Sequence, residues 1–271
     1  MSAGTPNVLE RILAEARRDL ERRKRERPLD ARTLASPRRR AGRGRFAEAL
    51  AAPAIGVIAE FKRRSPSAGV LLENADQRAI VEAYARGGAV ALSVLTEGPN
   101  FGGSLDDLLV AAEVCDLPRL RKDFIVDPYQ LHESLAAGAD AVLLIVAALG
   151  QRELSSLHEH ARTLGLDVLV EVHDGDELRR ALDAGAEIVG VNNRDLRDFS
   201  VDLERTERLM GEMPAGVTVV SESGIGSPEQ LERLQRLGVQ GVLVGESLMR
   251  SGDPQAALER LRTFRHTESA L

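Results

Sequence analysis

The sequence predicts an α/β protein whose main body is a (β/α)8 TIM barrel with an N-terminal helical extension. From residue 56 onward, eight short apolar stretches alternate with eight longer stretches in which apolar residues recur at helical spacing. Three helical stretches end in a glycine turn that leads into the next apolar stretch, at residues 137–140, 184–187 and 237–240. This alternation over about 220 residues is typical of a closed parallel barrel.

The first 50 residues are assigned to the extension, which we expect to pack on the barrel formed by residues 51–271. Asn7 can cap a first helix, and Pro28 ends that helix or closely follows its end. One face of the helix is apolar and consists of Val8, Leu9, Ile12, Leu13, Ala16 and Leu20. A second, short helix is expected at residues 46–50, just before the first strand.

Most of the barrel strands are short apolar runs, and we expect them to be buried. The strands are residues 56–60, 90–95, 119–122, 141–145, 167–171, 188–191, 217–221 and 241–244. Helices are expected near residues 76–86, 104–115, 128–137, 150–164, 174–184, 202–211, 227–237 and 254–264. An open, doubly wound sheet is the alternative, and it is disfavoured because no Gly-x-Gly-x-x-Gly follows a strand.

Composition narrows the class of protein and its partners. The single cysteine, Cys115, rules out a disulfide framework, and the longest apolar run, residues 141–149, is too short to span a membrane. Residues 1–50 hold 14 Lys or Arg against 7 Asp or Glu, whereas the formal charge of the whole chain is -6. No aromatic residue is interleaved with the basic runs, so we expect no nucleic acid partner. We expect a cytoplasmic protein that does not bind membranes, and a monomer, with weak oligomerisation as the alternative.

Charged and polar residues gather where the predicted strands end. In a (β/α)8 barrel the carboxyl ends of the strands form one mouth, which is where chemistry takes place. The side chains at these ends include Glu60, Lys62, Lys122, Glu171, Asn192, Arg194 and Glu222. Ammonium and carboxylate groups can act as acids and bases, and crowding can tune their pKa values. An ordinary surface salt bridge is the alternative for Glu60 and Lys62.

The turns after the seventh and eighth strands favour a bound phosphate. Ser223 and Gly224 follow one strand, and Gly245 and Glu246 follow the next and open a short helix. Glycine lets backbone N–H groups approach an anion, and these two loops are the usual phosphate site of this fold. Plain tight turns are the alternative. The pattern predicts a small phosphorylated substrate.

No pattern indicates a metal or another cofactor. His158 and His160 lie two apart on a predicted helix and therefore point to nearly opposite sides. The remaining histidines show no ligand spacing, and only His173, just past Glu171, could lie near the mouth. No serine or cysteine has a recognisable base partner. We expect acid–base chemistry without a metal.

Seven stretches, spread over nearly the whole chain, together resemble the indole-3-glycerol-phosphate synthase family of tryptophan biosynthesis. They are residues 57–67 (VIAEFKRRSPS), 92–97 (LSVLTE), 120–126 (LRKDFIV), 169–173 (LVEVH), 190–196 (GVNNRDL), 221–225 (SESGI) and 245–249 (GESLM). The resemblance implies a lyase that closes 1-(2-carboxyphenylamino)-1-deoxyribulose 5-phosphate to an indole, with loss of carbon dioxide and water.

The resemblance also implies roles for individual residues. Lys122 would be the general acid and Glu171 the general base, while Lys62 would hold the substrate carboxylate or act as a second acid. Glu60 and Glu222 would keep the lysines charged, and Asn192 and Arg194 would orient the substrate. The implied phosphate site comprises Ser65, Ser223, Gly224, Gly245 and the backbone N–H of Glu246. The implied apolar wall comprises Phe101, Phe124, Leu143 and Leu196.

Two other functions fit parts of the same pattern. Another phosphosugar barrel, such as phosphoribosylanthranilate isomerase, would need an acid–base pair but no second lysine facing a carboxylate. A phosphate-ligand sensor would need no poised acid and base. Both alternatives are disfavoured by the presence of Lys62 and Lys122 together with Glu171. The synthase interpretation requires Lys62, Lys122 and Glu171 to face a common cavity.

Overall fold

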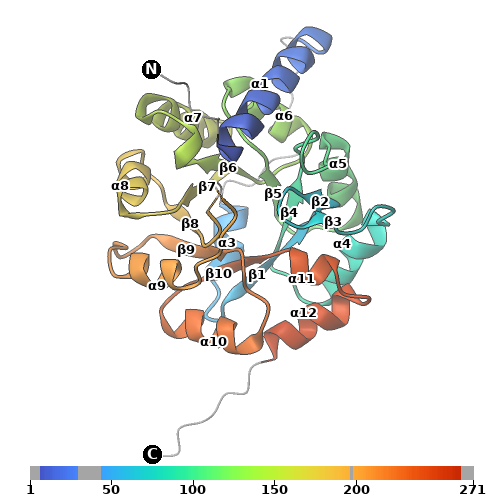
Figure 1. The fold of residues 1–271 in the computed structure, drawn as a ribbon, viewed down its shortest axis with the longest axis vertical. Coiled ribbons are helices and arrows are strands. Elements are labelled where there is room, and N and C mark those ends of the chain that lie inside the picture. Colours follow the sequence, from blue (N-terminus) through green and yellow to red (C-terminus); the bar gives the residue numbers. More distant parts are fainter. Residues whose placement is uncertain (1–6, 30–43, 196–197, 264–271) are drawn as a thin grey trace, which may run out of the picture.

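Eight parallel strands close into a barrel in a computed structural model that describes residues 7–29, 44–195 and 198–263 (Figure 1). The strands, in their order around the barrel, are β1 (Gly56–Phe61), β10 (Gly241–Val244), β9 (Thr218–Glu222), β8 (Ile188–Asn192), β7 (Asp167–Val172), β6 (Ala141–Ile145), β5 (Arg119–Lys122) and β4 (Ala91–Leu95). The first and last strands pair in parallel, with Gly56 opposite Gly241, and this pairing closes the sheet. The predicted closed barrel is confirmed.

An outer ring of helices follows the strands. It consists of α4 (Gln77–Arg86), α5 (Leu105–Val114), α6 (Pro128–Ala136), α7 (Gln151–Thr163), α8 (Gly175–Asp183), α9 (Glu204–Met210), α10 (Pro228–Arg236) and α12 (Pro254–Arg262). Most of these helices begin at an Asp or Ser whose side chain accepts a hydrogen bond from a first-turn N–H, as Asp76 does from Ala79 and Ser227 from Gln230. The short predicted helix after β10 is also present, as α11 (Glu246–Met249).

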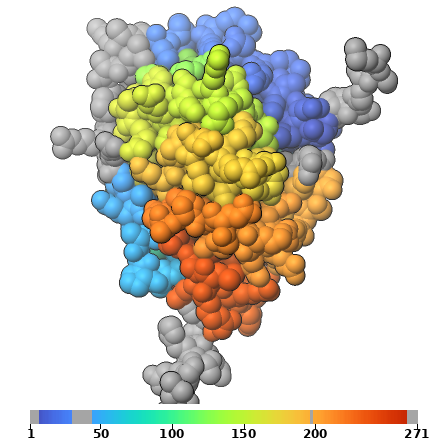
Figure 2. Space-filling view, turned by 90° about the vertical axis from the view of Figure 1, so that its left-hand side faces the viewer, coloured from blue at the N-terminus to red at the C-terminus, as the bar shows by residue number. Residues whose placement is uncertain are grey.

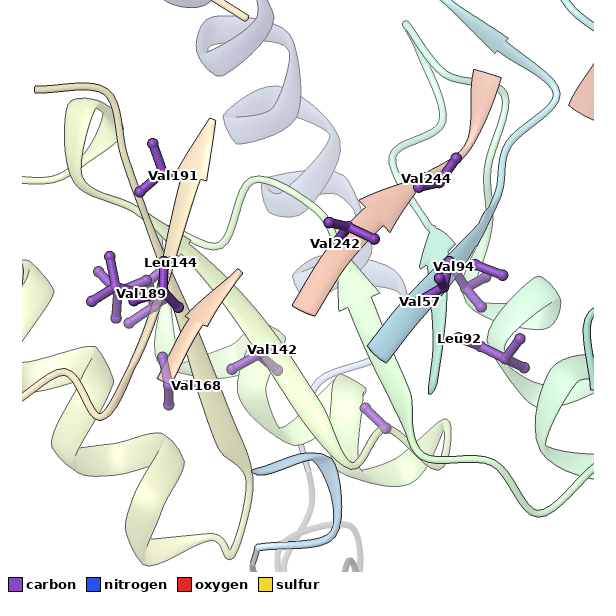
Figure 3. Packing of buried hydrophobic residues seen from close by; sticks show 14 of the residues in the cluster. Val57, Leu92, Val94, Val142, Leu144, Val168, Val189, Val191, Val242 and Val244 are labelled. Carbon is purple, nitrogen blue, oxygen red and sulfur yellow. The ribbon is translucent and has the colours of Figure 1, made fainter. Parts of the chain in front are cut away.

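Successive side chains along each strand point to opposite faces of the sheet, and this divides the core into two layers. Side chains such as Val57, Val142, Val189 and Val242 point outward and pack beneath the helices (Figure 3). Their neighbours in sequence point into the barrel, where Ile58, Leu120, Leu169 and Leu243 belong to a second apolar cluster. The strands are therefore buried on both faces, in line with the burial expected from the sequence.

A short helix closes the barrel at the amino ends of the strands. This helix, α3 (Arg45–Leu50), places Phe46 and Leu50 in the interior cluster. It has no local side-chain cap, and Asp167 at the start of β7 instead accepts hydrogen bonds from the backbone N–H groups of Gly44, Phe46 and Ala47. Among the described residues, this helix therefore covers the barrel interior at the amino ends of the strands.

The N-terminal helix α1 (Val8–Glu26) lies against the other end of the barrel, with a capping box formed by Asn7 and Glu10. Four of the predicted apolar residues, Leu9, Ile12, Ala16 and Leu20, are buried. Polar contacts fix the helix to the barrel, including Lys24 Nζ to Asp127 (2.6 Å), Arg23 Nε to Glu133 (3.4 Å) and Glu15 to Asn100 Nδ2 (3.0 Å). The loop that carries Asn100 is thereby joined to the extension.

Segments that are neighbours in sequence also lie next to one another in space. In Figure 2 the colours run from the blue N-terminal helix at the top, through yellow, to the red C-terminal helices, and light-blue residues lie beside orange ones. The latter contact reflects the pairing of the first barrel strand with the last.

The predicted elements are observed with small shifts at their ends, and three short ones were not predicted. A two-stranded hairpin of β2 (Arg64–Ser65) and β3 (Gly69–Val70) lies in the loop after β1. A 3-10 turn, η1 (Val146–Ala148), follows β6. Among the described residues, no helix combines the length and apolar character needed to cross a membrane.

Candidate active site

A cavity of about 360 Å³ lies at the carboxyl ends of the strands. The residues predicted from the sequence that the structure describes all line it. They are Glu60, Lys62, Ser65, Phe101, Lys122, Phe124, Leu143, Glu171, Asn192, Arg194, Glu222, Ser223, Gly224, Gly245 and Glu246. Leu196, the remaining predicted site residue, lies outside the described residues. Segments that are up to 186 positions apart in the sequence therefore meet at one mouth.

Lys122 lies between two buried carboxylates. Its Nζ is 3.2 Å from Glu171 Oε2 and 3.3 Å from Glu222 Oε2. Burial opposes the charge on Lys122, but the negative charges of Glu222, Glu171 and Glu60 outweigh it and raise the pKa of Lys122. Lys122 is therefore an ammonium ion. Glu171 and Glu222 hold this ammonium group at the wall of the cavity.

The two carboxylates beside Lys122 have different ionisation behaviour. Burial favours protonation of Glu171, but the charges of Lys122 and His173 and a hydrogen bond from Asn192 Nδ2 (3.1 Å) outweigh burial and lower its pKa. Burial raises the pKa of Glu222 to about 7, and the nearby negative charges of Glu171 and Glu60 add to the increase, against the opposing effect of Lys122. The cluster thus holds one carboxylate that is ionised and one that titrates near neutral pH.

Lys62 and Glu60 form a second ammonium–carboxylate pair in the same cavity. Lys62 Nζ is 2.7 Å from Glu60 Oε1, and the other oxygen of Glu60 accepts a hydrogen bond from Ser93 Oγ at 3.3 Å. Gly245 on the neighbouring strand end leaves room for Glu60, because a Cβ at this position would lie 2.6 Å from Glu60 Oε1. The Lys62 ammonium is thereby oriented along the cavity wall.

Asn192 connects the acid–base cluster to the rim. Its amide donates to Glu171, and its Oδ1 accepts from the backbone N–H of Arg194 (3.0 Å) and from Ser223 Oγ (2.8 Å). The Arg194 guanidinium lies 3.7 Å from Glu246 and is only partly buried. This guanidinium is therefore available to an anionic ligand at the rim.

The glycine-rich turns after β9 and β10 form one end of the cavity. Ser223 and Gly224 both have left-handed backbones, with φ of 64° and 81°. Asn193 holds this turn by donating from Nδ2 to the carbonyl oxygen of Ser223 at 3.2 Å. A non-glycine residue held at positive φ is a strained conformation of the kind that collects at functional sites.

Two aromatic rings and Leu143 line the cavity. The rings of Phe101 and Phe124 are 6.4 Å apart at an angle of 40°. The backbone N–H of Phe101 donates to buried Glu97 at 2.9 Å, which fixes the loop that carries this ring. Glu97 is not recognisable from the sequence, because a single acidic residue after a strand carries no specific signal.

Sequence reasoning also missed residues that position the predicted ones. Arg121 is fully buried and donates to Asp123 Oδ2 (2.8 Å). The two residues on either side of Lys122 in the sequence therefore form an ion pair with each other. Gly190 in the middle of β8 is required because a Cβ there would lie 2.2 Å from Glu222 Oε1. A glycine inside a strand is a signal of close approach that could have identified it. Phe199 also lines the cavity and lies in an irregular segment without a sequence pattern.

No group of three or more His, Cys, Asp or Glu side chains within the described ranges has the arrangement of a metal site. His158 and His160, the pair considered from the sequence, do not converge. His158 is on the buried face of α7, whereas the ring of His160 packs edge-on against His132 at 5.2 Å.

Comparisons with known proteins identify the family of the chain. The family model for indole-3-glycerol phosphate synthase matches residues 9–261. An indole-3-glycerol phosphate synthase of Rhizorhabdus wittichii is 47% identical over 260 residues, which are 95% of this chain and 98% of that protein. One from a Parafrankia species is 49% identical over 257 residues, 95% of this chain and 96% of that protein.

Solved structures with low sequence identity share the fold. A mutant tryptophan synthase α-subunit from Pyrococcus furiosus superposes with a TM-score of 0.58 at 15% identity, covering 76% of this chain and 97% of that one. A thiamine phosphate pyrophosphorylase from the same organism has the same TM-score at 19% identity, covering 78% of this chain and 94% of that one. Identities this low bear on the barrel alone, whereas the family model and the curated relatives show that the chain belongs to the indole-3-glycerol phosphate synthase family.

Proposed function

We propose that Lys122 is the general acid and Glu171 the general base of the reaction that defines this family. In that reaction 1-(2-carboxyphenylamino)-1-deoxyribulose 5-phosphate closes to indole-3-glycerol phosphate and releases carbon dioxide and water. The observation that carries the assignment is the position of Lys122, which faces the cavity with Nζ 3.2 Å from Glu171.

Ring closure joins the ring carbon that bears the carboxylate to the ketone carbon, and the ketone oxygen becomes an alkoxide. Lys122 donates a proton to this oxygen. Glu222 has a pKa of about 7, so near neutral pH it is protonated part of the time. When it is neutral, one fewer carboxylate holds the proton of Lys122, and Lys122 becomes the stronger acid.

Loss of carbon dioxide restores the aromatic ring and needs little assistance. Dehydration then removes the hydroxyl group as water with a proton from an ammonium group, and Glu171 accepts the proton that leaves carbon. Glu171 suits a base because its pKa is lowered and it is ionised at neutral pH. Lys62, held by Glu60, binds the substrate carboxylate or serves as the second acid.

Substrate orientation follows from the remaining cavity residues. Ser65, Ser223 and Gly224, together with the backbone of Gly245 and Glu246, would bind the phosphate, because these turns direct small side chains and N–H groups into one end of the cavity. Asn192 and Arg194 would orient the polar groups of the substrate. Phe101, Phe124 and Leu143 would enclose its aromatic ring.

Further parts of the proposal concern the whole chain. It comprises an N-terminal extension of residues 1–50 on a catalytic barrel of residues 51–271, and it acts as a cytoplasmic monomer without nucleic acid or membrane partners. The reaction needs no metal ion or other cofactor, because ammonium and carboxylate groups supply each proton transfer that it requires.

The test is conversion of the carboxyphenylamino substrate, followed by the fluorescence of the indole product. We expect Lys122→Met to lower kcat by about a hundredfold or more with a small change in KM. Lys122→Arg should also fail, because a guanidinium does not release a proton at this pH. Lys24→Arg on α1 is the matched control and should retain activity, since Arg can replace Lys24 in its pair with Asp127.

The same assay in excess EDTA should give the wild-type rate. Near-normal turnover by Lys122→Met would remove Lys122 from the role of acid. A loss of activity in EDTA that a divalent ion restores would overturn the metal-free mechanism.

A further inference from the structure

His173 lies beside Glu171 and is not among the described residues that line the cavity. The two residues are two positions apart at the end of β7, so their side chains leave the extended chain on the same side. His173 Nε2 is 3.5 Å from Glu171 Oε1, and the side chain of His173 is 11% exposed. Glu171, by contrast, does line the cavity.

Glu177, in the first turn of α8, determines which nitrogen of His173 carries a proton. Its Oε2 accepts the backbone N–H of His173 at 2.8 Å and lies 3.0 Å from His173 Nδ1. A carboxylate only accepts hydrogen bonds, so Nδ1 is the protonated nitrogen of a neutral ring. In that case Nε2 presents a lone pair to Glu171.

A lone pair on Nε2 would face a carboxylate oxygen, and two acceptors at this distance repel one another. His173 Nε2 is buried and has no hydrogen-bond partner within the described part of the chain. A second proton, on Nε2, relieves the repulsion and turns His173 into an imidazolium between Glu177 and Glu171. Burial and the charge of Arg205 oppose this, but the hydrogen bond to Glu177 and the charge of Glu171 outweigh them and raise the pKa of His173.

The positive charge of His173 distinguishes Glu171 from Glu222. Both carboxylates touch Lys122, at 3.2 and 3.3 Å, and both are at most 2% exposed. Glu171 has further stabilising neighbours in Asn192 and His173. Glu222 Oε1 has no hydrogen-bond partner among the described residues, and its other neighbours include the negative charges of Glu171 and Glu60. Two carboxylates that share one cation cannot both ionise easily, so the better stabilised one stays charged.

We propose that His173 is a positioning residue that decides which carboxylate beside Lys122 carries the proton. As an imidazolium held by Glu177, it keeps Glu171 ionised and leaves the proton to Glu222. This inference rests on the proposed role of Glu171 as the base. It extends that role from the cavity to a chain of charges, Glu177–His173–Glu171–Lys122, that begins on an outer helix.

The test is the pH dependence of kcat/KM, whose acidic limb reports the ionisation of the base in the free enzyme. In His173→Gln the charge beside Glu171 is lost, so the pKa of Glu171 rises and the acidic limb moves to higher pH. We expect a shift of about one pH unit, as is typical for loss of one close charge. The rate at pH values below the limb should then fall about tenfold. It should return to near the wild-type value at alkaline pH.

A second variant separates this effect from damage to the fold. Glu177→Gln leaves His173 in place but removes the anion that stabilises its charge, so it should move the acidic limb in the same direction. His132→Gln on α6 is the matched control and should leave the profile unchanged, because His132 packs against His160 outside the cavity. An unshifted limb in His173→Gln and Glu177→Gln, or an equal loss of rate at every pH, would overturn the inference.

Glu171→Gln distinguishes failure of the inference from failure of the proposed base. Wild-type turnover in Glu171→Gln would remove Glu171 from the mechanism, and His173 would lose its role with it. An inactive Glu171→Gln together with an unshifted His173→Gln profile would leave the base in place and overturn the inference alone.

Discussion

Lysine is rare in this chain, and that rarity has a chemical meaning at the scale of single residues. Of the 36 Lys and Arg residues, only Lys24, Lys62 and Lys122 are lysines, and the last two face the cavity. Arginine serves almost everywhere else that a positive charge is needed. A guanidinium stays protonated in proteins, whereas an ammonium can give up its proton when its surroundings change. The few lysines of such an arginine-rich chain are therefore candidates for proton transfer. This indication can be obtained from the sequence alone.

Glu222 should make the folded protein less stable as the pH rises. Its folded pKa of about 7 lies above its ordinary value of 4.5. Between these values the folded protein holds a proton that the unfolded chain has released, so the free energy of unfolding falls as pH rises through this window. Glu222→Gln imitates the protonated state and removes the penalty. We expect Glu222→Gln to be more stable than the wild type at pH 8, by a few kcal/mol, since one pKa unit corresponds to about 1.4 kcal/mol.

Urea unfolding at a series of pH values measures this difference. The stability advantage of Glu222→Gln should shrink as the pH falls toward 4.5, because both proteins then carry a neutral group at this position. Glu73→Gln serves as the control, since Glu73 is exposed and does not line the cavity. A constant difference across the pH range would contradict the raised pKa of Glu222.

At the scale of secondary-structure elements, helix α3 depends on a cap from a distant part of the sequence. Asp167 accepts the backbone N–H groups of Gly44, Phe46 and Ala47, although more than 100 residues separate them. Three N–H groups would lose their partner in Asp167→Ala, and unsatisfied buried donors cost about 1–3 kcal/mol each. Allowing for partial access of water, we expect Asp167→Ala to lower the free energy of unfolding by about 2–3 kcal/mol.

Asp76→Ala is the control because Asp76 is an ordinary cap that accepts only the N–H of Ala79 in its own helix α4. It should cost about 1 kcal/mol. Chemical denaturation of both variants makes the comparison. Equal losses would show that the contacts of Asp167 add nothing beyond a local cap.

Elements of this fold could be predicted because their signals are local. The strands β6 and β10 begin and end at the predicted residues, since an apolar run bounded by turns defines both ends. The bounds of β5 were also predicted correctly, although three of its four residues are charged. The hairpin of β2 and β3 was missed because strands of two residues contain no period. The long-range cap of α3 was missed for a different reason: Asp167 stands at the start of a strand, and only the folded barrel brings it to the helix.

At the scale of the whole molecule, one pairing between strands from opposite ends of the barrel sequence decides that the sheet closes into a barrel and does not stay open. Gly56 to Ala59 pair with Gly241 to Val244. No local pattern encodes this contact, and the prediction rested on the number and regularity of the repeats. The same closure brings Glu60 next to Gly245 and places strand-end residues around one cavity. The predicted site residues therefore depended on topology, whereas the contact between His173 and Glu171 required atomic positions.

Charge is distributed unevenly over the molecule, and this distribution should steer an anionic substrate. The first 50 residues carry excess positive charge although the chain as a whole is negative. Within α1, Arg17 and Arg18 are exposed, make no ion pair with another described residue, and follow Glu15, which contacts the loop at the cavity mouth. Charges placed beside a mouth raise the rate at which an oppositely charged ligand arrives, and salt screens this effect.

Replacing both Arg17 and Arg18 with Gln should therefore lower kcat/KM about threefold at low salt and leave kcat unchanged, because the substrate bears a carboxylate and a phosphate. The difference should vanish at about 1 M salt, where the Debye length is about 3 Å. Arg86→Gln combined with Arg236→Gln removes the same charge at the carboxyl ends of α4 and α10, the end of the barrel opposite the mouth. Steady-state kinetics over a range of salt concentrations should show little change for this control. If both pairs of substitutions had the same effect, net charge rather than its placement would govern arrival of the substrate.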